Sequence, residues 1–194
     1  MDSAATLLGA YTGDPVESAY DQLLDDLPGP RWPGVERTPQ RAAAAWRELT
    51  RGYQQDPRQL LTLFDAEGYD EMILVRDIPF YSLCEHHLLP FHGLAQVGYI
   101  PSTSIVGLSK IARVVDAYAR RLQVQERLTD QIADLLWEGL AARGVIVILS
   151  AEHLCMTMRG VMKPGALTTT SVVRGILKDD PRARHEALAL LGRP

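Results

Sequence analysis

Cysteine is scarce in this sequence: only Cys84 and Cys155 occur among 194 residues. A small secreted protein held together by disulfides would carry more of them. The opening residues Met1-Asp2-Ser3 lack the basic and then apolar stretches of a signal peptide, and no run approaches the roughly 18 apolar residues of a membrane span. We therefore predict a cytoplasmic protein with reduced thiols and no membrane partner.

An excess of positive charge is also missing. Lysine and arginine total 20 against 24 aspartates and glutamates, which gives a formal net charge of −4. A protein that binds nucleic acid through its overall field would be basic, so we expect no nucleic-acid partner. Any anion-binding site must come from a local cluster of cations.

Glycine and proline, at 15 and 12 residues, are too few for a low-complexity chain. Apolar residues make up 46% and charged residues 23%, which is ordinary for a globular protein. We find no repeat and no linker. The sequence therefore predicts a single domain over residues 1–194, with a helical section at 1–66 and the core at 67–194.

Helical and extended patterns occur in separate groups along the chain. Thr38 is a predicted N-cap with Pro39 at the first helical position, and Gly52 is a plausible stop. This order is typical of an α+β fold with a mostly antiparallel sheet. The predicted helices are 15–27, 38–52, 57–64, 109–121, 125–142 and 181–191, and the predicted strands are 72–80, 93–100, 144–160 and 167–175.

Both cysteines lie beside histidines, in Cys84-Glu85-His86-His87 and His153-Leu154-Cys155. Cysteine and histidine are the favoured ligands of zinc, and a Cys-x2-His spacing lets both residues reach one ion. Cys84 and His87 have that spacing, and Cys155 would supply a third ligand from a distant strand. Three protein ligands leave the fourth tetrahedral position to water, which is the pattern of a catalytic zinc site.

Other interpretations of these clusters remain open at this point. Each cysteine could be a small buried hydrophobe beside a histidine. The two cysteines could form a disulfide. His86 or His153 could close a four-ligand structural site. A cytidine-deaminase site is excluded, because it requires C-x-x-C and the chain has none.

A long strand over 144–160 would place alternate side chains on one face. His153, Cys155 and Arg159 would then point the same way, with Arg159 about 13 Å along the strand from Cys155 at about 3.3 Å per residue. We therefore expect a metal ligand, a proton-transfer histidine and an anion-binding arginine to line one groove.

Lys110 and Arg113 lie three residues apart in the first turn of a predicted helix, where backbone N–H groups already favour an anion. A bound phosphate would explain two cations there, although a solvated polar face would explain them too. Ser109 can equally be an N-cap. Gln125 and Glu126 begin the next helix, where a carboxylate is favourable by itself and could also accept hydrogen bonds from a guanine.

Taken together, these segments resemble one family closely. The resemblance covers roughly residues 30–190, and the spacing between the segments fits without large gaps. The segments are CEHHLLPFHG, GYIP, GLSKIARVVD, QVQERLTDQIADLLWE, AEHLCMTMRG and TTTSVVRG. As a set they are similar to GTP cyclohydrolase I.

The resemblance implies the tunnelling fold, in which antiparallel sheets with paired helices assemble into rings, typically two stacked pentamers. It implies conversion of GTP and water to 7,8-dihydroneopterin triphosphate and formate, the entry step to folate and pterin synthesis. It also implies a homo-oligomer whose sites form where subunits meet. Each site would combine residues of more than one chain.

The resemblance further assigns a role to each matching residue. Zinc is the implied cofactor, held by Cys84, His87 and Cys155. Proton transfer falls to His86 and His153, and Ser109 lies near the ribose. The implied substrate-binding residues are Gln125 and Glu126 for guanine, and Lys110, Arg113, Arg159 and Arg41 for the triphosphate.

Two other function classes are considered beside this one. A related zinc hydrolase that stops at an earlier intermediate would share the metal motifs but lack part of the base- and phosphate-binding set. A non-catalytic protein that binds purines or pterins would have lost a metal ligand or His153. This chain largely keeps the base- and phosphate-binding set, and it keeps the metal ligands and His153.

Overall fold

Residues 13–192 are described by the computed structural model, and they divide into two units after Glu48. The first unit holds helix α1 (Pro15–Asp25), a 3-10 turn η1 (Pro33–Val35) and helix α2 (Thr38–Leu49). Asp14 caps α1, because its carboxylate accepts the Val16 N–H and also pairs with Arg47 at 2.5 Å. Thr38 is itself helical, so α2 begins one residue earlier than an N-cap at Thr38 predicts.

The second unit carries all the strands. Its first part contains η2 (Arg51–Gln54), η3 (Pro57–Leu60), β1 (Leu63–Asp65), β2 (Ile73–Cys84), β3 (Pro90–Ile100) and β4 (Ser104–Val106). The remainder contains α3 (Leu108–Ala119), β5 (Leu122–Gln123), α4 (Gln125–Leu140), β6 (Gly144–His153), α5 (Leu154–Thr157), β7 (Leu167–Gly175), α6 (Ile176–Asp179) and α7 (Pro181–Leu191).

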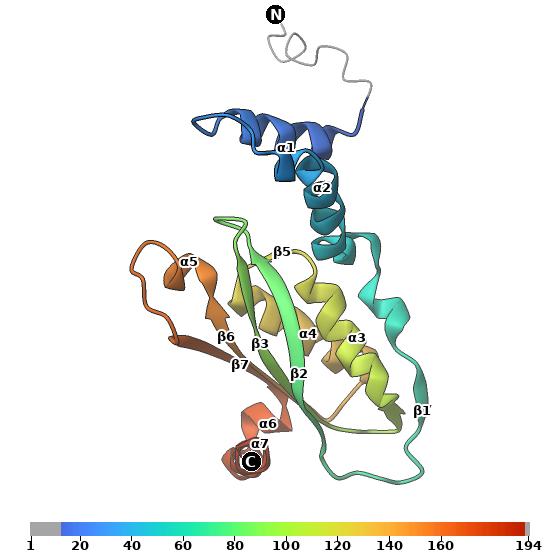
Figure 1. The fold of residues 1–194 in the computed structure, drawn as a ribbon. Coiled ribbons are helices and arrows are strands. Elements are labelled where there is room, and N and C mark those ends of the chain that lie inside the picture. The colour runs from blue at the N-terminus through green and yellow to red at the C-terminus, as the bar shows by residue number, and fades with distance from the viewer. Residues whose placement is uncertain (1–12, 193–194) are drawn as a thin grey trace, which may run out of the picture. The chain divides into compact units, whose positions relative to one another are not determined.

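Five of the strands form one sheet in the order β5-β2-β3-β6-β7. The pairs β2–β3, β3–β6 and β6–β7 are antiparallel, and only the two-residue β5 runs parallel to β2. Helices α3 and α4 cover one face of this sheet (Figure 1). The expected α+β architecture with a mostly antiparallel sheet and paired helices is therefore confirmed.

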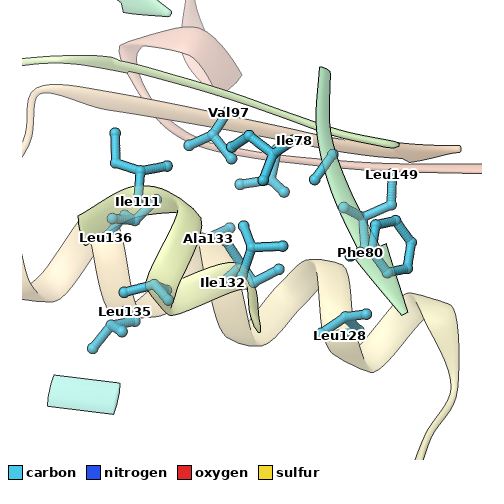
Figure 2. Packing of buried hydrophobic residues seen from close by; sticks show 14 of the residues in the cluster. Ile78, Phe80, Val97, Ile111, Leu128, Ile132, Ala133, Leu135, Leu136 and Leu149 are labelled. Carbon is cyan, nitrogen blue, oxygen red and sulfur yellow. The ribbon is translucent and has the colours of Figure 1, made fainter. Parts of the chain in front are cut away.

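The core lies between the sheet and these two helices. Alternate residues of β6, from Val145 to Ala151, are fully buried on that face. They meet the apolar stripe of α4, including Leu128, Ile132 and Leu136, as Figure 2 shows. This alternation on the strand and helical spacing on α4 are the two periods that buried faces require. The core therefore holds the sheet and α4 in a fixed register.

The opposite face of the sheet is only partly covered. Ile146 packs against Leu177, Ala187 and Leu191 from α6 and α7. Elsewhere on the sheet, in the β2–β3 turn and on the segment after α5, large apolar side chains remain exposed in the single chain. They include Tyr81, Leu88, Leu94, Met158, Val161, Met162 and Leu167.

Two predicted elements are wrong. Residues 57–64 do not form a helix: a 3-10 turn ends at Leu60, and Leu63–Asp65 instead pair with β4, about 40 residues further on. The strand predicted over 144–160 ends at His153, and a helical turn follows. Strand β3 pairs with it only back to Phe91, and β7 only from Leu167. Beyond that point no partner strand is present in the described part of the chain, and the Met158 N–H bonds to Leu154 C=O instead.

No helix within residues 13–192 is both long and apolar enough to cross a membrane.

Candidate metal centre and active site

The first two candidate ligands sit on the tight connection between β2 and β3. The Cys84 C=O accepts hydrogen bonds from the N–H groups of His87 and Leu88, at 3.3 and 2.8 Å. This single turn brings positions i and i+3 to the same side, which is why the Cys-x2-His spacing works here. Leu88 takes a positive φ of 56° to lead the chain back into β3.

The turn is anchored from the neighbouring elements. The Glu85 N–H donates to Gln123 C=O on β5 at 3.0 Å. The Glu85 carboxylate also pairs with Arg127 of α4, and the hydrogen bond to Arg127 holds the pKa of Glu85 below its usual range. The ends of β5 and α4 therefore fix the turn that carries Cys84 and His87.

Cys155 reaches the same place from β6. Strand β3 lies between β2 and β6, and its Phe91 is the register partner of His153. Cys155 follows two residues later on α5. The Sγ atoms of Cys84 and Cys155 and a ring nitrogen of His87 all lie within 4.8 Å of one another. The structure thus brings together the three predicted ligands from segments about 70 residues apart.

These donors fit a zinc ion. Bond lengths of about 2.3 Å to sulfur and 2.0–2.1 Å to nitrogen at tetrahedral angles separate a thiolate and an imidazole nitrogen by about 3.6 Å. Cys84 Sγ lies 3.7 Å from His87 Nδ1. Both cysteines are free thiols, so the disulfide alternative is wrong. Among the described residues, the cluster holds three candidate ligands and no fourth.

The electrostatics of the cluster favour occupation by a cation. Burial raises the pKa of the Cys155 thiol, and the neighbouring Cys84 thiol raises it further. A positive charge beside Cys155 would favour its thiolate. A divalent cation would supply that charge.

Two histidines adjoin the three candidate ligands. His86 Nδ1 lies 3.8 Å from Cys84 Sγ, and the His86 side chain is largely exposed. His153 is half-buried: its ring stacks on Phe91, with the centroids 4.6 Å apart, and its Nε2 lies 2.8 Å from Gln125 Oε1. Burial lowers the pKa of His153, and the charge of nearby Glu126 opposes that shift. Glu126 itself is exposed in the first turn of α4.

Arg159 is exposed beyond α5, near enough for its charge to act on Cys155. The predicted strand face through His153, Cys155 and Arg159 is wrong, because the strand ends at His153. Cys155 reaches the cluster from a helical turn instead. The residues still gather, but the alternation of a strand is not what gathers them.

Ser109, Lys110 and Arg113 lie elsewhere in the same chain. They occupy the first turns of α3, beside β1 and β4, whereas the C-terminal end of α3 leads into β5 and so to Cys84 (Figure 1). At 1.5 Å per residue, Ser109 lies about 15 Å along the helix from that end. No carboxylate within residues 13–192 forms an ion pair with Lys110 or Arg113. Arg41 is exposed on α2, in the first unit.

The sequence model of the family described as GTP cyclohydrolase I matches residues 16–192. The chain belongs to the GTP cyclohydrolase I family. The resemblance found in the sequence motifs is therefore confirmed over nearly the whole chain.

Two relatives with that name agree with this assignment. A protein of Mycolicibacterium vanbaalenii named GTP cyclohydrolase 1 is 59% identical over 179 residues, covering 90% of this chain and 88% of that protein. One of Mycobacterium tuberculosis with the same name is 52% identical over 193 residues, covering 97% and 95%. Among solved structures, an archaeosine synthase QueF-Like in the apo form aligns with a TM-score of 0.45 and 15% identity, over 54% of this chain and 93% of that one.

Sequence reasoning missed three residues that surround His153 in this member of the GTP cyclohydrolase I family. Phe91 stacks on the His153 ring, and Thr129 and Thr170 hydrogen-bond around Gln125. Two signals for them were present in the sequence. Thr129 follows Gln125 by four residues and so shares its helix face, and Thr170 lies in a threonine-rich strand. Which of those threonines faces Gln125 depends on the β6–β7 register, which the sequence does not provide.

Proposed function

We propose that this chain converts GTP and water to 7,8-dihydroneopterin triphosphate and formate, as the enzyme that opens pterin and folate synthesis. The observation that carries the proposal is the meeting of Cys84, His87 and Cys155 beside His153, in a chain of the GTP cyclohydrolase I family. Zinc would be held by those three residues. A Cys2His set with an open fourth position is the arrangement through which zinc activates water for hydrolysis near neutral pH.

Each of the remaining residues would act on a different part of the substrate. Glu126, exposed beside His153, would accept hydrogen bonds from the guanine donors and so present the imidazole ring of the base. Arg159, which the same chain supplies, would bind a phosphate group of the substrate. His153 would donate a proton to a ring nitrogen as water adds at C8, and the imidazole ring would open to a formamide. Addition of a second water to that formamide would then release formate. His86 and Ser109 would assist the later opening and rearrangement of the ribose.

The test of this proposal is an assay of GTP turnover in which both formate and the pterin product are identified. Formate with 7,8-dihydroneopterin triphosphate supports the full reaction. A ring-opened or cyclic-phosphate product would instead indicate a zinc hydrolase that stops early. Binding of GTP or a pterin without any turnover by the metal-loaded protein would indicate a binding module.

A ring of subunits, most simply two stacked pentamers, completes the proposal. Lys110, Arg113 and Ser109 occupy the far end of α3 from the metal centre, and the two cations have no carboxylate partner in the described chain. A second copy would bring its own α3 to the site and cover exposed apolar residues such as Leu94 and Met158. Each site would then combine residues of at least two chains.

Mixing two inactive variants tests the shared site. We expect Cys155→Ser chains and Lys110→Ala/Arg113→Ala chains each to be inactive alone. Refolded together in equal amounts, they should regain about a quarter of parental turnover, because one interface in four would carry both intact halves. Analytical ultracentrifugation of the same samples reports the assembly. Mixtures that form the full assembly without regaining activity would refute a shared site.

Base recognition is tested at Glu126. A hydrogen bond to a charged group contributes about 1.5–3 kcal/mol, so Glu126→Gln should lower kcat/KM for GTP by roughly 10- to 150-fold. ATP, which lacks the guanine donors, should be a poor substrate of the parent. Glu138→Gln, an exposed glutamate near the other end of α4, is the matched control and should leave kcat/KM unchanged. Equal use of ATP and GTP by the parent would remove Glu126 from base recognition.

A further inference from the structure

The side chain of Gln125 is unusual for a residue expected to read a base, because it is 1% exposed and fully hydrogen-bonded within the chain. Its Oε1 lies 2.8 Å from His153 Nε2. Its Nε2 donates to Leu149 C=O and Thr168 C=O, each at 3.0 Å, and to Thr170 Oγ1 at 3.1 Å. Both polar atoms of the amide therefore already have partners within the chain, in a side chain that is shielded from solvent.

The direction of these bonds follows from the chemistry of the partners. Backbone carbonyls only accept hydrogen bonds, so the atom facing Leu149 and Thr168 must be the NH2 group of Gln125. The oxygen of the amide therefore faces His153. An amide oxygen only accepts, so His153 must donate to it through an Nε2–H.

Two threonines reinforce this orientation. The Thr129 hydroxyl donates its only proton to the backbone C=O of Gln125, at 2.7 Å. Its oxygen must therefore accept from the Thr170 hydroxyl, 2.6 Å away. Thr170 has then used its only proton, and its oxygen is left to accept from the Gln125 amide. The amide has two hydrogens for three neighbouring acceptors, so one hydrogen is shared between two of them. All three neighbours accept, so the NH2 group faces them and the amide oxygen faces His153.

Stacking on a neighbouring ring also restricts the orientation of the His153 imidazole. The Phe91 ring, completely buried on β3, lies parallel to it with an interplanar angle of 2°. Stacking fixes the plane of the imidazole, and the bond to Gln125 fixes which edge faces the helix. Together they leave the ring one orientation and one neutral tautomer.

We infer that Gln125 is a positioning residue, which holds His153 as the Nε2–H tautomer and leaves Nδ1 as the nitrogen that exchanges a proton with the substrate. The inference rests on the proposed function, in which His153 transfers a proton. When the imidazolium gives up a proton, the Nδ1–H bond breaks, its electron pair stays on Nδ1, and a new N–H bond forms on the substrate. Nε2 keeps its hydrogen throughout, so the Gln125 amide oxygen accepts the same hydrogen bond before and after the step.

The direct test is 15N NMR of the zinc-loaded parent protein with labelled histidine, with His153 assigned by the signals that disappear in His153→Ala. Chemical shifts of the two ring nitrogens distinguish the tautomers. We expect a protonated Nε2 and an unprotonated Nδ1. An Nδ1–H tautomer in the parent would overturn the inference whatever the variants do. The spectrum requires no turnover, so it stands apart from any failure of the proposed function.

Gln125→Met tests the role kinetically, because it keeps the length of the side chain and removes the acceptor. Losing the partner that orients a functional histidine typically costs about 10–100-fold, so kcat should fall by that factor while KM for GTP stays within about threefold. His153 should show a mixture of tautomers. A raised KM with an unchanged kcat would instead assign Gln125 to base recognition and refute the inference.

The matched control is Tyr99→Phe. Tyr99 is fully buried near the other end of β3, and its hydroxyl accepts the Val106 N–H at 3.1 Å without contacting His153. It should lose comparable stability but keep the parental kcat and tautomer. If Gln125→Met does not fold, Thr170→Val removes one acceptor of the amide and should shift the tautomer and lower kcat. Its exposed neighbour Thr169→Val should do neither, and an unshifted Thr170→Val protein would count against the network.

Discussion

Cys155→Ser is expected to lose bound metal and to fall to background turnover of GTP. A serine hydroxyl does not ionise near neutral pH, so two of the three ligands remain, and two ligands do not hold zinc in a tetrahedral site. The fold should persist, because Cys155 is only partly buried on α5 and packs at the margin of the core. Elemental analysis per chain and circular dichroism on one sample measure both expectations.

A histidine pair supplies the control that the cysteines cannot, because both cysteines are candidate ligands. His87→Asn should lose the metal as Cys155→Ser does. His92→Asn, on β3 where its ring stacks on Tyr81 at 5.7 Å, should keep it. A Cys155→Ser protein that still carries one zinc per chain would contradict the assignment of this cluster.

His153→Ala should separate catalysis from metal binding. The residue is not one of the three candidate ligands, so zinc content should be unchanged, and the cations proposed to bind phosphate remain. Loss of a positioned general acid typically costs 10²–10⁴-fold, so single-turnover release of formate at saturating GTP should slow by about that factor. Zinc content and thermal midpoint are recorded on the same samples.

His185→Ala is the matched control, since His185 is exposed on α7 and far along the chain from the metal centre. It should release formate at the parental rate. If His153 were only a packed strand residue, its loss would lower the thermal midpoint and leave the rate per folded site intact. A zinc-loaded His153→Ala protein with the parental rate would remove His153 from the mechanism.

The sequence predicted those parts of the site whose geometry is local. The spacing of Cys84 and His87 becomes one turn of backbone, and the Cys155 motif carries its histidine two residues away. The core helices and strands likewise follow from their own periodicity. Residues 63–65 could not be assigned from their own sequence, because their strand exists only through pairing with β4.

The end of β6 and the contacts of Gln125 likewise depend on residues that are far away in the sequence. His153 is the last strand residue because β3 and β7 provide partners only that far. Gln125 begins a helix, as its sequence suggests, but its amide meets Leu149 and Thr170 only after β6 and β7 pair in one register. Sequence motifs identified the residues, whereas their partners required the tertiary fold.

Strand β3 lies between β2 and β6, the strands that lead to the two candidate ligand segments, and this position limits which changes in chain length the protein can accept. Its pairing with β2 places the Cys84 turn, and its pairing with β6 places Phe91 opposite His153. One residue inserted or deleted within β3 would turn the side chains beyond it to the other face and shift both ligand segments by about 3.3 Å. The exposed segment 160–166, which follows Arg159, joins no strand pair, so insertions among relatives should collect there and be absent from β3.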